Sequence, residues 1–501
     1  MKKLLYIFSL LAVSLGFVSC EPEFENPISE DFYHSGEADF SNYVAVGNSL
    51  TAGYTNGTLY RSAQSMSVPK IISEQMKFAG GGEFTQPYLE DDVNDVGGLL
   101  LMGNVIAAPK LIVDASEGTV EPINKMPTIE VSNVHPGPYN NMGVPGAKIF
   151  HLLAPGYGSL LNLAQGKANP YYVRMASTPD AMVIEDAISQ HPTFFTLWIG
   201  NNDVLSYATS GGTGTFQAGN QDVTTYASND ITDPGVFGYA YQALLDGLTA
   251  NGAKGVVATV PDVSSIPFFT TIPYNPIPLT DQAVVDALNA AYEQYNQGLA
   301  QLAALGVITA EEAAARTISF TVGANALVIE DETLTDLTGY GLPSIRQATS
   351  EDLILLTAKS IIGKPDPNNP QLINGITIPL ADNWVLIPQE IENIQTATAS
   401  YNAIIEQLAA AKGVAFADMA AVMQKLHDKL ATEDGSIYTA DYFNGTNIDE
   451  LAFGLDGVHP NPKGYALIAN EFIKVINASY QANLPLVNPS YYPTIEILPS
   501  N

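Results

Sequence analysis

The sequence of 501 residues contains a single cysteine, Cys20, and few basic residues, with 20 lysines and arginines against 52 acidic residues. One thiol excludes an internal disulfide and any metal site built from several cysteines. The net charge of −32 disfavours nucleic acid as a partner, because both molecules are then negatively charged. Charged residues make up only 14% of the chain and hydrophobic residues 46%, which excludes a disordered protein and predicts a large core.

Long apolar runs are also lacking, since no stretch beyond residue 20 reaches the roughly 18 apolar residues of a transmembrane helix. Residues 1–20, MKKLLYIFSLLAVSLGFVSC, combine Lys2 and Lys3 with an apolar run that ends before Cys20. This pattern resembles a bacterial lipoprotein signal peptide. The resemblance implies that residues 1–19 are removed and that a lipid on Cys20 anchors the protein at the cell envelope. The membrane would be the outer membrane, with the protein in the periplasm or on the cell surface. An ordinary secretory signal that is cleaved elsewhere is the alternative.

The chain beyond the signal divides by composition. An acidic tether, a folded region and a tail are predicted at residues 20–40, 41–480 and 481–501. Three stretches of the folded region lack a regular pattern and are interpreted as insertions into one core: residues 83–140, 205–235 and 307–388.

Strand and helix patterns alternate in the remainder of the folded region. Four continuously apolar stretches are predicted as buried strands: YVAVGNS (43–49), TFFTLWIGNND (193–203), KGVVATVPD (254–262) and GVAFADM (413–419). Residues 281–304 and 390–411 carry apolar side chains at steps of three and four, which indicates helices. The alternation predicts an α/β domain with a parallel sheet.

Polar and glycine-rich segments follow several of these strands. Ser49, in Gly47-Asn48-Ser49-Leu50, enters a helix at the edge where open α/β sheets bind ligands, although a serine there is also a common helix cap. Asp456 and His459 share a loop before a predicted helix, where the carboxylate can orient the imidazole. The segments Asn141–Gly146 and Gly200–Asp203 could also lie at a binding site, but each taken alone is explained as well by a simple turn.

In this order, the four segments resemble the blocks of the SGNH/GDSL hydrolases, the GDSL-like lipases and esterases, and they span residues 47–459. The resemblance implies a flavodoxin-like three-layer α/β/α sandwich with a parallel sheet that carries large insertions. It further implies an enzyme that hydrolyses carboxylic esters through an acyl-enzyme intermediate, with no cofactor and no metal ion.

The resemblance also implies roles for individual residues. Ser49 would be the nucleophile, His459 the general base and Asp456 the residue that orients His459. The backbone amides of Ser49 and Gly146 and the side-chain amide of Asn202 would form the oxyanion hole, with Gly143 as a less suitable donor. The sequence departs from the family pattern in having Asn48 where the family has Asp, a position outside the catalytic groups, and Pro145 where a small polar residue is frequent.

Two other enzyme families fit the sequence less well. Thr51 breaks the G-x-S-x-G elbow of the α/β-hydrolases, and GNND lacks the histidine of the metallophosphoesterase motif that it otherwise resembles. The non-enzyme alternative is a hydrolase fold that has lost its catalytic activity and binds lipid or glycan in the cell envelope.

The substrate remains open between an acyl lipid and an O-acetylated glycan, as a small molecule or attached to a polymer. Residues 266–279, rich in proline and aromatic side chains, are either the wall of an acyl site or a packed loop. The sequence does not indicate an oligomeric state.

Overall fold

The computed structural model describes residues 32–432 and 435–498. The predicted signal peptide, Cys20 and the first part of the predicted tether lie outside the described residues. Among the described helices, none combines the length and the apolar character needed to cross a membrane.

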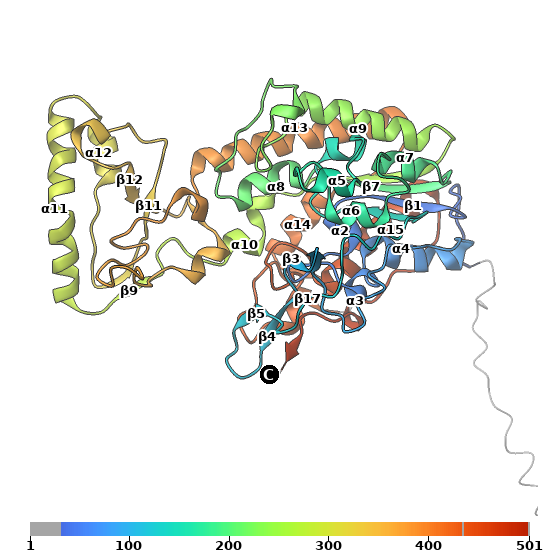
Figure 1. Cartoon of the computed structure of the whole chain (residues 1–501), viewed down its shortest axis with the longest axis horizontal. Helices are drawn as coiled ribbons and strands as arrows, with labels where there is room; N and C mark the ends of the chain where they lie inside the picture. Colours follow the sequence, from blue (N-terminus) through green and yellow to red (C-terminus); the bar gives the residue numbers. More distant parts are fainter. Residues whose placement is uncertain (1–31, 433–434, 499–501) are drawn as a thin grey trace, which may run out of the picture.

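A five-stranded sheet forms the centre of the molecule, and all of its strands run parallel (Figure 1). From one edge to the other, the strands are β6 (Asn141–Gly143), β1 (Tyr43–Gly47), β7 (Phe194–Trp198), β8 (Lys254–Ala258) and β15 (Ala415–Ala417). Four of them are the predicted apolar strands, so the α/β class with a parallel sheet is confirmed. The fifth, β6, lies in a segment that the sequence marked only as a glycine turn. In chain order, the strands are arranged second, first, third, fourth and fifth.

Helices cover both faces of this sheet. One face packs against α7 (Val183–Ile188), α9 (Pro234–Thr249) and α13 (Pro388–Lys412), and the other against α4 (Val68–Met76) and α15 (Pro462–Tyr480). Successive side chains of β1 alternate between the two cores, because neighbouring residues of a strand point to opposite faces. Val44 and Val46 belong to the first core, and Tyr43 and Ala45 to the second.

A lobe with its own apolar core lies to one side of the sheet layers (Figure 1). It contains β9 (Ile277–Leu279), α11 (Gln282–Ala304), α12 (Ala310–Arg316), β10 (Gly323–Asn325), β11 (Val328–Glu330), β12 (Ile345–Gln347), β13 (Leu353–Ile354) and β14 (Val385–Leu386). The helix predicted at 281–304 is confirmed as α11, but it packs in this lobe and not beside the central sheet. Its apolar stripe is covered locally, and Tyr295 Oη donates to the carbonyl of Ile345 at 2.7 Å. The lobe is therefore larger than the insertion expected at 307–388.

The ends of the described chain are packed against the folded body. Residues 32–40 were expected to belong to a flexible tether, but Phe40 is buried against Phe194 with their ring centroids 5.0 Å apart. At the other end, β18 (Ile497–Leu498) pairs in parallel with β4 (Leu111–Asp114). The apolar residues in both segments explain why they join the fold.

Short elements complete the structure. The region 83–140 also holds β2 (Leu99–Leu101), β3 (Asn104–Ala107) and β5 (Val120–Pro122). The other short elements are α2 (Ser49–Ala52), α3 (Arg61–Gln64), α5 (Leu160–Leu163), α6 (Pro170–Met175), α8 (Asn202–Thr209), α10 (Pro267–Thr270), α14 (Met419–His427), β16 (Leu430–Ala431) and β17 (Ile437–Tyr438).

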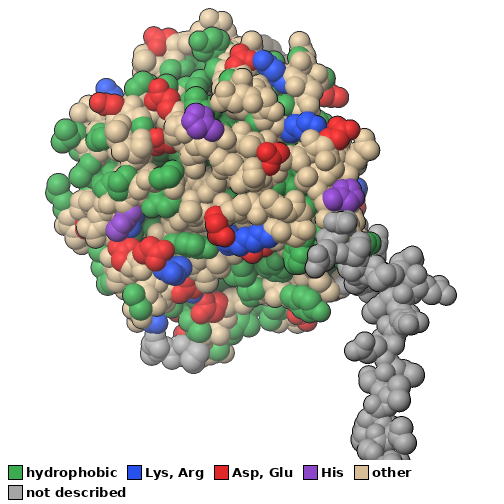
Figure 2. Space-filling model, turned by 90° about the vertical axis from the view of Figure 1, so that its right-hand side faces the viewer, with side chains coloured by type: hydrophobic (Ala, Val, Ile, Leu, Met, Phe, Trp, Pro, Cys, Tyr) green, Lys and Arg blue, Asp and Glu red, His purple; other side chains and the backbone are tan. Residues whose placement is uncertain are grey.

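The surface reflects the low content of charged residues. Figure 2 shows one face, on which acidic and basic side chains lie scattered among uncharged and apolar ones. The few lysine and arginine side chains on this face lie beside acidic ones, so positive charge is not concentrated there.

The buried guanidinium of Arg346 stabilises the lobe, and its removal tests whether the lobe unfolds separately from the sheet core. Arg346 donates to Asp331 through Nε and to Asp352 through both terminal nitrogens, each at 2.6 Å. Replacing it (Arg346→Met) leaves two buried carboxylates unpaired, and breaking such pairs costs about 3–5 kcal/mol. We expect limited proteolysis of this variant to cut within residues 277–387 while the sheet core stays resistant. The matched control Arg61→Met removes an exposed ion pair with Glu90 and a contact with the Tyr88 ring, both outside the lobe, so cutting within residues 277–387 should stay as in the parent protein. Proteolysis spread evenly over the chain would show that the lobe does not unfold separately.

Candidate active site

Ser49 lies where β1 ends and α2 begins, and two neighbours fix its position. Asn48 is fully buried, and its Oδ1 accepts a hydrogen bond from the backbone N–H of Leu50 at 3.0 Å. Asn48 Nδ2 donates to Asn201 Oδ1 at 3.1 Å, which ties the end of β1 to the end of β7. Asn48 therefore serves as a helix cap and as a link between two strand ends.

Asp456 organises the loop that carries His459. Its Oδ1 accepts the backbone N–H groups of Val458 and His459, both at 2.9 Å. Its Oδ2 accepts from His459 Nδ1 at 3.0 Å and from the backbone N–H of Gly57 at 2.8 Å. The carboxylate therefore fixes both the loop and the direction of the imidazole.

The structure brings the three predicted residues together. His459 Nε2 lies 3.0 Å from Ser49 Oγ, although the two residues are 410 positions apart in the chain. Because Nδ1 donates its proton to Asp456, the network assigns Nε2 as the acceptor for the Ser49 hydroxyl. The side chains of His459 and Asp456 are 14% and 12% exposed, so the site is shielded but accessible.

The charge of Asp456 is supported by its surroundings. Burial raises the pKa of this carboxyl, but the charge of His459 and the hydrogen bonds from His459 and Val458 outweigh burial, and the pKa falls below its ordinary value. Asp456 is therefore ionised at neutral pH. A carboxylate behind Nδ1 stabilises the imidazolium that forms when Nε2 takes a proton.

The predicted oxyanion-hole donors differ in how their hydrogen bonds are used. Within the described part of the chain, the N–H groups of Ser49 and Gly146 donate to no protein acceptor. Gly143 N–H donates to Asn141 Oδ1 at 3.0 Å, which leaves Gly146 as the better donor of the two glycines. Asn202 Nδ2 uses one N–H on the carbonyl of Ala147 at 3.0 Å and keeps the other.

Asp203 ends the predicted segment Gly200–Asp203, but the sequence assigned it no individual role; the structure shows that it links this segment to the chain that follows Gly146. It is fully buried, and it accepts from the backbone N–H of Ile149 at 3.0 Å and from Thr232 Oγ1 at 2.7 Å. Burial raises the pKa of this carboxyl to about 6. Together with the Asn202 bond to Ala147, it positions the turn that carries Gly146.

Tyr54 and Gly57 form a second support that the sequence did not reveal. The Tyr54 ring centroid lies 4.6 Å from that of the His459 imidazole. Tyr54 Oη donates to the Gly57 carbonyl at 2.5 Å, and the N–H of Gly57 reaches Asp456. No motif marks this turn, because its role depends on a contact between distant segments.

An apolar pocket opens beside Ser49 and His459. The space between atoms in this pocket is about 720 Å³, a volume that includes open solvent at its mouth. Its wall is made of apolar side chains together with Asn201 and Asn202; the apolar side chains include Leu50, Trp198, Leu205, Val263, Ile266, Met419, Val422, Met423, Leu426, Phe453 and Ile468. The pocket therefore offers a water-excluding surface that begins at the Ser49 hydroxyl.

Of the two interpretations of residues 266–279, the structure favours the packed loop, because Phe268 and Phe269 are buried outside this wall. Of residues 266–279, only Ile266 lines the pocket, and Ile277–Leu279 forms β9 in the lobe. Helix α14 supplies Met419, Val422, Met423 and Leu426 instead. Sequence alone could not distinguish this stripe from one that packs on the core.

One group of described residues has the donors for a metal ion, and it is not at Ser49. The carboxylates of Glu332, Asp382 and Glu390 converge where the lobe meets α13. The six histidines do not gather around Ser49 either, since His459 alone among them lines its pocket.

The geometry predicts how Ser49 responds to loss of its supporting carboxylate. Asp456→Asn places an amide behind Nδ1 and favours the wrong imidazole tautomer, a change that costs about 10⁴-fold in rate in a serine triad. We expect the rate of fluorophosphonate labelling at Ser49 to fall by roughly that factor, with an unchanged circular dichroism spectrum. Asp449→Asn, an exposed acid in the same region, should label at the parent rate. Undiminished labelling of Asp456→Asn would contradict the arrangement.

Comparisons of this chain with protein-family models, with curated proteins and with solved structures find no match.

Proposed function

We propose that the protein is a serine esterase of the SGNH/GDSL type that hydrolyses carboxylic esters. The observation that carries the proposal is the continuous hydrogen-bonded chain from Asp456 through His459 to Ser49, with both contacts of His459 at 3.0 Å. Such a chain is the arrangement that activates a serine as a nucleophile.

The position of the chain in the fold supports the same proposal. The sheet order of second, first, third, fourth and fifth strand is that of flavodoxin-like sheets, which is the fold that the resemblance implies. Ligands in such sheets bind at the carboxyl ends of the strands, where the strand order reverses. Ser49 begins α2 two residues after the end of β1, which lies between β6 and β7.

The residues suit each step of ester hydrolysis. Ser49 Oγ attacks the carbonyl carbon while His459 Nε2 takes the hydroxyl proton. The N–H groups of Ser49, Gly146 and Asn202 stabilise the oxyanion. When the tetrahedral intermediate collapses, the C–O bond to the alcohol breaks and His459 gives its proton to that alcohol. Water then attacks the acyl-enzyme in the same way, which releases the acid and restores Ser49.

The pocket favours an acyl group longer than acetyl. The acyl chain stays attached to Ser49 Oγ in the acyl-enzyme, so it extends into the cavity that begins there. Each buried methylene adds about 0.8 kcal/mol. The apolar wall therefore favours an acyl lipid or another medium- to long-chain ester over an O-acetylated glycan.

The place of action is part of the proposal. Residues 1–20 have the pattern of a lipoprotein signal, and we propose that the enzyme acts at the cell envelope, anchored through Cys20. An acyl ester in or near a membrane would suit an anchored enzyme.

Turnover of p-nitrophenyl esters tests the proposal. We would measure protein that begins at residue 21 on acyl chains from acetyl to palmitoyl, beside Ser49→Ala. We expect hydrolysis by the parent protein and the loss of nearly all of it in Ser49→Ala, because no other group replaces the nucleophile. Ser65→Ala, at an exposed serine on the helix-rich region after Ser49, is the matched control.

Two results would overturn the proposal of a serine esterase. Equal turnover by Ser49→Ala would remove Ser49 from the reaction. A folded parent protein with neither turnover nor fluorophosphonate labelling would favour the binding lipoprotein instead.

Narrowing the pocket should change the preferred chain length. Leu205 lies on α8 in the pocket wall and is half-buried. In Leu205→Trp, the larger side chain should fill part of the cavity without overfilling the core. We expect kcat/KM for long chains to fall at least tenfold while that for acetyl changes little. Leu161→Trp, at a position that is 83% exposed, should keep the parent profile. An equal loss at all chain lengths would place the acyl chain elsewhere.

A further inference from the structure

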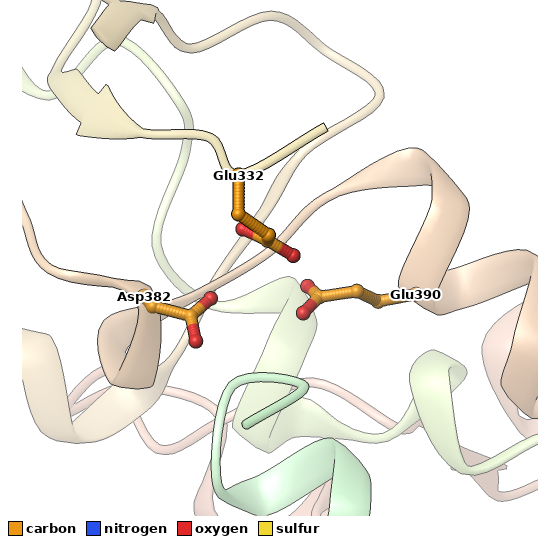
Figure 3. A group of neighbouring side chains, drawn as sticks. All are labelled: Glu332, Asp382 and Glu390. Carbon is orange, nitrogen blue, oxygen red and sulfur yellow. The ribbon is translucent and has the colours of Figure 1, made fainter. Parts of the chain in front are cut away.

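Three carboxylates converge where the lobe meets the central domain (Figure 3). Glu332 follows β11 in the lobe, Asp382 begins the short helix Asp382–Trp384, and Glu390 lies in the first turn of α13. One oxygen of each residue lies within 4.8 Å of the others. They come from three separate segments, so the fold itself brings like charges together.

Protein cations do not balance this charge. Across residues 32–432 and 435–498, no lysine or arginine forms an ion pair with any of the three carboxylates. Arg346 binds the adjacent Asp331 and Asp352 instead. Burial, together with the neighbouring acidic groups, raises the pKa of Asp382 to about 6 and that of Glu390 to about 8.

Glu390 gives an independent sign that something is bound there. The residue is only 3% exposed, and Figure 3 shows its carboxylate directed into the group. Its Oε2 accepts from the backbone N–H of Ile387 at 2.9 Å, but its buried Oε1 has no hydrogen-bond partner. A buried carboxylate oxygen without a partner is costly unless a cation or a proton satisfies it.

We propose that Glu332, Asp382 and Glu390 bind a calcium ion that fastens the lobe to the central domain. Carboxylate oxygens are the ligands of hard divalent cations. Calcium binds oxygen at about 2.3–2.6 Å, so two of its ligands can lie up to about 5 Å apart. Magnesium, at about 2.1 Å, spans only about 4.2 Å and would require the group to contract.

The surroundings allow entry of an ion and hold its deepest ligand. Glu332 is exposed, Asp382 is half-buried and Glu390 is buried, so the group opens to solvent on one side. The loop after α8 closes over Glu390 at Gly212, where a Cβ atom would lie 1.6 Å from Oε1. Three protein ligands leave positions for water, which predicts a dissociation constant of about 10⁻⁴–10⁻³ M, as in extracellular calcium modules.

The ion would join two separately packed bodies. Glu332 belongs to the lobe, whereas α13 carries Ile394 and Tyr401 into the core on one face of the sheet. A ligand that binds the folded form alone raises the free energy of unfolding by RT ln(1 + [L]/Kd). Calcium should therefore raise the melting temperature even though Ser49 does not touch it.

The test uses protein that begins at residue 21, with calcium and terbium as probes. We expect 5 mM CaCl₂ to raise the melting temperature by several degrees, and MgCl₂ at equal concentration to have less effect. Terbium luminescence should be excited through Trp384, which lies two residues from Asp382, and calcium should displace the terbium. Trp384→Phe should reduce the luminescence to the part that Tyr207, near the three carboxylates, can excite, and should keep the calcium-dependent shift. Trp198 lies in the central sheet.

Variants separate this site from general binding to an acidic surface. Glu332→Gln is at an exposed position and should fold normally with a reduced calcium shift, and Glu390→Gln should abolish the shift. Glu351→Gln, an exposed acid elsewhere in the lobe, is the matched control and should respond like the parent. An equal calcium shift in all variants would overturn the proposal. A parent protein whose melting temperature does not change with calcium would also overturn the proposal. If Glu390→Gln were then more stable than the parent protein, Glu390 would hold a proton in place of a cation.

Discussion

The carboxylate of Asp456 is the interaction on which the site depends. It accepts hydrogen bonds from Gly57, Val458 and both the backbone and the ring of His459. Four donors on one buried carboxylate join the turn after α2 to the loop before α15. These hydrogen bonds also keep Asp456 negatively charged next to Nδ1 of His459, where the charge stabilises an imidazolium. Without this group, the His459 ring would be free to turn away from Ser49.

The parallel sheet supplies the second constraint, because the carboxyl ends of its strands meet at one edge. Asn48 binds Asn201 across the ends of β1 and β7, and Asp203 binds Ile149 beyond the end of β6. These buried contacts fix the donors around Ser49 before any ligand arrives. In the proposed ester hydrolysis, preorganised donors of this kind would stabilise a developing oxyanion without rearrangement.

The lobe shows a different use of buried charge. Arg346 neutralises two carboxylates inside the lobe, whereas Glu332, Asp382 and Glu390 meet at its boundary without a protein cation. In the first case, the pairing stabilises one core. In the second, the uncompensated charge lies between two cores, where a bound cation would couple them.

The sequence by itself determined the α/β class, four of the five central strands and the three residues of the chain from Asp456 to Ser49. These features have local signatures, such as continuous apolar runs and a short Asp-x-x-His spacing. Only the tertiary structure decided that α11 packs in a lobe, because an amphipathic stripe does not specify which surface covers it. Strand β6 has the sequence Asn-Met-Gly and lacks an apolar run, so no strand pattern marks it. The pocket stripe on α14 is indistinguishable from a core stripe. The roles of Tyr54, Asp203 and Glu390 arise from contacts between distant segments, which no local pattern records.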